Sequence, residues 1–113
     1  MGLRVVLGLL AVATAATICG VPSKADQTGL ASIHTLRHEG GRLCMADHFH
    51  YGSGGPSASQ GAAQREALRS WADFTALEYG SDWAHYGRAG SQRMKCKRSS
   101  SGWYCDVEAR PCR

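Results

Sequence analysis

Histidines between residues 34 and 50 are the side chains whose type and spacing could do chemistry in this chain. His48 and His50 stand two apart, and on an extended strand residues at this spacing point to the same face. Their imidazoles could therefore converge on one ion, with His34 or His38 from a neighbouring strand as a third ligand. Zinc, copper or nickel would suit such a set. The sequence predicts a metal site at His48, His50 and His34; the alternative is histidines that pack against the core or order a loop.

Catalytic arrangements are not recognisable in the sequence. No serine has the G-x-S-x-G setting of a nucleophile elbow, and carboxylates such as Glu78 and Asp82 are not paired in a known pattern. The glycine-rich stretch GSGGPSAS lacks the lysine of a phosphate-binding loop. We therefore predict no catalytic residue and a protein that is not an enzyme.

The first 25 residues predict a secretory signal peptide, which sets the compartment. Arg4 precedes an uncharged run of Leu, Val, Ala and Thr, and small and polar residues follow up to Ala25. The mature chain is then expected to be periplasmic or secreted, and to meet a membrane only during export. We expect residues 26–42 to form a lead-in with a first strand, and residues 43–113 to form a compact domain.

Four cysteines remain after this segment, and an even number in an exported chain predicts two disulfides. Residues 93–98 and 103–110 alternate in polarity around a cluster of Ser and Gly, as the strands of a β-hairpin do. One register places Cys96 opposite Cys105 and matches opposite charges, whereas a slip by two residues brings two arginines together. We prefer the first register, which predicts the disulfides Cys96–Cys105 and Cys44–Cys112.

The same register divides the hairpin into an apolar face and a charged face, because side chains alternate along a strand. Without Arg4 and Lys24 the mature domain is close to neutral, which is poor evidence for a nucleic-acid partner. The expected inner side consists of Met94, Cys96, Trp103, Cys105, Val107 and Ala109, and the outer side of Arg93, Lys95, Asp106 and Glu108.

A helix over residues 62–79 is the other strong element, because this stretch lacks Pro and Gly. Ser57 or Ser59 could cap its start, and Gly80 would end it. The spacing of its residues predicts a stripe that faces the sheet, made of Ala63, Ala67, Trp71, Phe74 and Glu78 and widened by Leu68, Ala72, Thr75 and Tyr79.

The N-terminal part of the mature chain carries weaker signals. Gly40 and Gly41 allow the positive φ angles of a two-residue turn, so a second hairpin could form around them. A strand is expected around residues 43–49. The glycine-rich residues 52–59 are expected to form a loop before the helix.

Several short motifs are spread over nearly the whole mature chain: Cys44-Met45, His48-x-His50-Tyr51-Gly52-x-Gly54, Trp71-x-x-Phe74, Glu78-Tyr79-Gly80-x-x-Trp83, Trp103-x-Cys105 and Arg110-Pro111-Cys112. Together they resemble a set of small exported hypothetical proteins of alphaproteobacteria, a group to which no activity is assigned. The resemblance implies a bacterial periplasmic setting and no particular chemistry.

The sequence therefore predicts a small single α+β domain, in which antiparallel hairpins pack against one main helix and disulfides staple the fold. The leading functional prediction is a non-enzymatic binding or structural module of the periplasm. It would have no cofactor and would act on an unidentified protein or envelope partner. The rival prediction is a zinc-, copper- or nickel-binding protein that uses the His-x-His pair.

Overall fold

The structure is a computed structural model that describes Gly2 and residues 28–113. The predicted signal peptide lies outside the described residues. Within the described part, no helix is long and apolar enough to cross a membrane. The elements, in chain order, are η1 (Leu30–Ile33), β1 (Leu36–Glu39), β2 (Arg42–Met45), β3 (His50–Ser57), α1 (Gln60–Tyr79), η2 (Ser81–Trp83), η3 (Tyr86–Arg88), β4 (Gly90–Ser99) and β5 (Gly102–Arg110).

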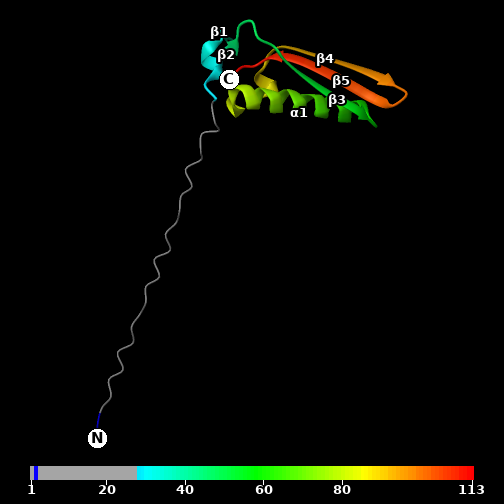
Figure 1. Cartoon of the computed structure of the whole chain (residues 1–113), viewed down its shortest axis with the longest axis horizontal. Helices are drawn as coiled ribbons and strands as arrows, with labels where there is room; N and C mark the ends of the chain where they lie inside the picture. Colours follow the sequence, from blue (N-terminus) through cyan, green and yellow to red (C-terminus); the bar gives the residue numbers. More distant parts are fainter. Residues whose placement is uncertain (1, 3–27) are drawn as a thin grey trace.

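The architecture is α+β, as predicted. Strands β3, β5 and β4 form an antiparallel sheet in that order, and α1 packs along one face of it (Figure 1). Strands β1 and β2 form a separate hairpin near the C-terminus of the chain (Figure 1). The face of the three-stranded sheet that points away from α1 carries the charged side chains of the β4–β5 hairpin.

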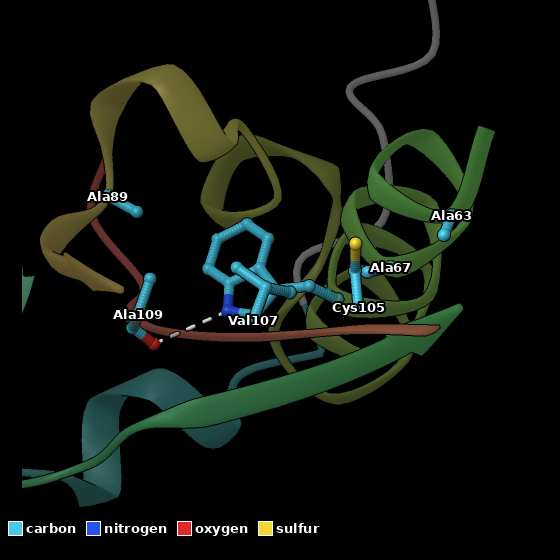
Figure 2. Close-up of a cluster of buried hydrophobic side chains, with 7 residues drawn as sticks. Ala63, Ala67, Ala89, Cys105, Val107 and Ala109 are labelled. Carbon is cyan, nitrogen blue, oxygen red and sulfur yellow. Dashed lines mark hydrogen bonds between the residues drawn. The ribbon is translucent and has the colours of Figure 1, made fainter. Parts of the chain in front are cut away.

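The β4–β5 hairpin has the predicted register. Cys96 pairs with Cys105, Lys95 with Asp106 and Arg93 with Glu108, and the first pair is joined by a disulfide. Cys105, Val107 and Ala109 are buried on the inner face, where Figure 2 shows them beside helix residues. The apolar face predicted for this hairpin is therefore confirmed.

Strand β3 corrects the prediction of a loop over residues 52–59. Gly52 and Gly54 alternate on the inner face of this strand, where α1 crosses it. A side-chain carbon at Gly52 would lie 2.5 Å from the amide nitrogen of Trp71, and one at Gly54 would lie 2.6 Å from that of Ala67. Only glycine fits at these two positions, because the helix backbone lies against the strand. A strand with such glycines has the same sequence pattern as a flexible loop, which is why a loop was predicted.

Helix α1 begins two residues before the predicted start, directly after Ser59, which is one of the two predicted caps, and it ends at the predicted glycine. The Ser59 side chain accepts a 3.1 Å hydrogen bond from the amide of Ala62. Gly80, with φ of 101°, follows the last helical residue. The buried stripe differs from the prediction at Phe74, which is 50% exposed, whereas Thr75, expected at the margin of the stripe, is buried. The buried residues recur every four positions, as Ala63, Ala67, Trp71, Thr75 and Tyr79.

Trp71 is the largest side chain in the core between α1 and the sheet. Its indole nitrogen donates a 3.3 Å hydrogen bond to the carbonyl of Ala109 on β5, drawn as a dashed line in Figure 2. This bond satisfies the one polar atom that the tryptophan brings into the core. It also fixes the helix against the central strand of the sheet.

The β1–β2 hairpin turns through Gly40 and Gly41, which both have positive φ angles of 51° and 77°. The expected strand over residues 43–49 stops at Met45. The second predicted disulfide, Cys44–Cys112, joins β2 to the C-terminal tail, and Leu43 exchanges backbone hydrogen bonds with Arg113. Two disulfides in so small a domain are typical of chains that fold in an oxidising, extracytoplasmic environment.

A buried ion pair joins the two sheets. Arg110, at the end of β5, is 6% exposed and donates a 2.8 Å hydrogen bond to the carboxylate of Glu39 on β1. The same guanidinium also donates to the hydroxyl of Ser91 and to the carbonyl of Ala46. The β1–β2 hairpin is thus held to the end of β5 by this ion pair, and to the C-terminal tail by the disulfide Cys44–Cys112.

Candidate metal centre

The histidines of the predicted site come from three places in the fold. His34 directly follows η1, His48 lies in the link between β2 and β3, and His50 is the first residue of β3. His48 and His50 are therefore not two residues of one strand, as the sequence prediction assumed. The bends of this link lie at Ala46 and Asp47, before His48, and the ring centroids of His48 and His50 are 5.1 Å apart.

A carboxylate completes the group. His34, His48 and Glu78 each offer one ligand atom, and these atoms all lie within 4.8 Å of one another. Glu78 comes from the last turn of α1, and its Oε1 lies 4.0 Å from Nε2 of His48. All three side chains are half-buried. Two imidazoles and one carboxylate thus meet where three distant segments of the chain converge.

His34 is oriented as a metal-binding histidine usually is. Its Nδ1 lies 3.0 Å from the carbonyl oxygen of Leu30, one helical turn earlier, and a carbonyl can only accept. The proton therefore sits on Nδ1, which leaves the lone pair on Nε2. Histidine ligands commonly donate their second ring nitrogen to a carbonyl in this manner, which fixes both tautomer and ring orientation.

His50 lies behind the group and is 1% exposed. Its Nδ1 is 2.9 Å from Oγ1 of Thr75, whose own hydroxyl proton is donated to the carbonyl of Trp71. Nδ1 of His50 must therefore be the donor to Thr75. Burial lowers the pKa of His50, and Glu78 opposes that effect by raising it. In the neutral ring the lone pair is then on Nε2.

That lone pair faces a carboxylate. Nε2 of His50 lies 2.9 Å from Oε2 of Glu78, but the two atoms do not have the alignment of a hydrogen bond. A lone pair and a carboxylate oxygen repel each other at this distance unless a proton or a metal ion lies beside them. The pair is therefore relieved either by a proton on Nε2 of His50 or by a cation beside Glu78.

Tyr79 supports the rings of all three histidines. It stacks on His50 with centroids 5.0 Å apart, and it contacts His34 and His48 edge-on at 5.3 and 5.9 Å. Burial, and then the neighbouring Glu78, raise the pKa of Tyr79 well above its usual range, so its hydroxyl keeps its proton. That hydroxyl lies 3.3 Å from Nε2 of His34. Tyr79 thus acts as a rigid wall beside the three rings, and its hydroxyl would have to turn away from Nε2 of His34 when that lone pair binds a metal.

A cavity opens beside two of the three candidate ligands. It has a volume of about 240 Å³ and is lined by Ile33, His34, Thr35, Asp47 and His48. An ion held by the two histidines would face this space. A second cavity, of about 150 Å³, lies on the charged outer face of the sheet, where Tyr51 and Ser53 donate to Glu108 and Asp106.

The other predicted and alternative ligands lie elsewhere. His38 is on β1 and exposed, and it does not belong to the group. Glu39 lies near the sulfurs of Cys44 and Cys112, but those sulfurs are bonded to each other and cannot act as thiolate ligands. Within residues 28–113, only the group of His34, His48 and Glu78 therefore offers three free ligand atoms.

Sequence reasoning missed Glu78 as a ligand, although it placed this residue on the helix face that meets the sheet. A glutamate is rarely found on such a face without a partner. That mismatch was the available signal for a polar site at the end of the helix.

A comparison of the chain with protein-family models finds no match, and comparisons with curated proteins and with solved structures find no significant similarity.

Proposed function

We propose that this protein binds a divalent transition metal through His34, His48 and Glu78, in an oxidising compartment of the bacterial envelope. The observation that carries the proposal is the meeting of three ligand atoms, from η1, the β2–β3 link and α1, within 4.8 Å of one another. An exported, periplasmic setting is part of the proposal, and the two disulfides support it.

The ligand set favours zinc, with copper and nickel as the other candidates. Zinc is commonly bound by two histidines and one glutamate, with a fourth position left to water or another ligand. Copper and nickel also accept imidazole. Hard cations such as magnesium and calcium prefer all-oxygen ligands, which this site does not supply.

The test is the stoichiometry and affinity of zinc binding to the oxidised full protein, measured by native mass spectrometry and isothermal titration calorimetry. We expect one zinc ion per chain. His48→Ala and Glu78→Gln should each weaken binding at least about tenfold, because each removes a ligand. His38→Ala is the matched control, since His38 is exposed and lies outside the group.

A protein that binds none of zinc, copper and nickel, or whose metal binding survives both ligand substitutions unchanged, would overturn the proposal. The protein would then belong to the other class that the sequence predicts, a non-enzymatic module that binds an unidentified protein or envelope component without a metal.

A further inference from the structure

The cavity beside the candidate ligands is lined by imidazoles, by a carboxylate and by an apolar side chain. His34 and His48 line one side, where a metal would present its open coordination position. Asp47 brings a carboxylate to the same cavity, and Ile33 brings an apolar side chain that is 78% exposed. A volume of about 240 Å³ is far more than one water molecule fills.

The carboxylate of Asp47 has no partner of its own. Within residues 28–113 it makes no hydrogen bond and no ion pair, in contrast to Glu39, Glu78, Asp106 and Glu108. It also lies outside the group of three ligand atoms. Asp47 is therefore free to receive a cationic group from a molecule in the cavity.

Taken together, these walls match the three parts of an apolar α-amino acid. A carboxylate is a suitable fourth ligand for a zinc ion that already has two imidazoles and one carboxylate. An ammonium group pairs with a carboxylate through charge-assisted hydrogen bonds. A branched apolar side chain would cover Ile33 and remove its surface from water.

We propose that the metal-loaded protein binds a free α-amino acid with an apolar side chain in this cavity. The amino acid's carboxylate would bind the metal, its ammonium group would pair with Asp47, and its side chain would contact Ile33. This inference rests on the proposed metal site, and it assigns that site a ligand class, a zwitterion. The carboxylate would take the coordination position that water otherwise fills, and no covalent bond of the amino acid is made or broken.

The experiment uses the oxidised full protein loaded with zinc, and L-leucine as the probe. Native mass spectrometry should show a ternary species of protein, zinc and leucine, and calorimetry should show leucine binding only after zinc is added. Zinc retained on the protein is measured after filtration in each titration, because free amino acids also chelate zinc. A metal-free protein that binds leucine equally well would overturn the inference.

The contact between the ammonium group and Asp47 is tested with two probe molecules, L-leucine and N-acetyl-L-leucine, and with two variants of the protein. Asp47→Asn should weaken leucine binding about tenfold, the usual effect of losing one charge-assisted hydrogen bond. N-acetyl-L-leucine lacks the ammonium group, so it should bind the wild type more weakly than leucine does. Its affinity should also be the same for the wild type and for Asp47→Asn. Asp73→Asn makes the same charge change on an exposed part of α1 and should leave leucine binding unaltered.

The outcomes separate the two proposals. Zinc that fails to bind removes the metal site itself. Zinc that binds without any ternary species, or leucine that only strips zinc from the protein, overturns the amino-acid site and leaves the metal site intact. If Asp47→Asn weakens zinc binding instead of leucine binding, Asp47 is a fourth metal ligand and the inference is wrong.

Discussion

Nε2 of the buried His50 lies 2.9 Å from Oε2 of Glu78, while Nδ1 of the same ring is committed to Thr75. The buried His50 therefore lies behind the glutamate, whereas His34 and His48 are half-buried and line a cavity. A carboxylate held between a buried imidazole and two half-buried ones is a strong point of attraction for a cation. The functional predictions below depend on this arrangement.

Glu78→Gln tests the carboxylate without changing its shape. Zinc affinity should fall at least about tenfold, because a charged ligand becomes a neutral amide. The thermal unfolding temperature of the metal-free protein should change little, since the amide has the shape of the carboxylate and removes its repulsion with the lone pair of His50. Calorimetric titration and a thermal melt of the same sample measure both quantities. A large loss of stability with zinc affinity unchanged would show that Glu78 has only a structural role.

Zinc should also raise the stability of the fold. A ligand that binds only the native state stabilises it by about 2.7 kcal/mol when its free concentration is one hundred times the dissociation constant. Wild-type protein should therefore melt at a higher temperature with zinc than with a chelator. His48→Ala should lose this shift while His38→Ala keeps it. An equal shift in both variants would place the zinc elsewhere.

Gly52→Ala and Gly54→Ala test the close contact of β3 and α1. Each new methyl group would meet helix backbone at 2.6 Å or less, and backbone cannot rotate away as a side chain can. We expect each variant to lose about 1–3 kcal/mol or more in the free energy of unfolding, measured with urea. Gly87→Ala is the control, because nothing lies within 4 Å of the added carbon. Equal stability of all three variants would contradict the packing.

Trp71→Ala and Phe74→Ala test which aromatic residue of the helix belongs to the core. Trp71 is fully buried and hydrogen-bonded to Ala109, so its loss should cost about 3–5 kcal/mol. Phe74 is 50% exposed, and its loss should cost about 1 kcal/mol or less. Denaturant titration measures both variants. A larger loss for Phe74→Ala would restore the stripe that the sequence predicted.

The two disulfides should differ in what they contribute. Cys44–Cys112 spans 68 residues and Cys96–Cys105 spans 9, so the chain-entropy model assigns them about 4 and about 2.6 kcal/mol. Replacing each pair by alanine, one pair at a time, and measuring the free energy of unfolding compares them. If the loss of Cys96–Cys105 lowers the free energy of unfolding more than the loss of Cys44–Cys112 does, loop length does not determine how much each disulfide stabilises the fold.

The β4–β5 hairpin could be predicted from the sequence down to its register, because several independent signals agree there. Charge pairs, apolar alternation and two cysteines all fit one alignment of Arg93–Arg98 with Trp103–Glu108, and the structure has that alignment. Once Cys96 was paired with Cys105, the other disulfide followed. The helix was equally accessible, since its cap and its terminal glycine both carry local signatures.

Strand β3 could not be predicted, because the glycines that allow close packing look like the glycines of a loop. Gly52 and Gly54 have meaning only once Ala63 and Ala67 are known to lie against them. The candidate site depends in the same way on tertiary structure. His34 and Glu78 are 44 positions apart in the sequence, and no local pattern indicates that the end of α1 meets the residue after η1.

X-ray absorption at the zinc edge, on the oxidised protein loaded with one zinc ion, tests the central claim most directly. We predict a first shell of nitrogen and oxygen at about 2.0–2.2 Å, with an outer-shell signal of two imidazoles in the wild type and of one imidazole in His48→Ala. A shell of sulfur at about 2.3 Å, or a spectrum that His48→Ala leaves unchanged, would contradict a metal centre built from His34, His48 and Glu78.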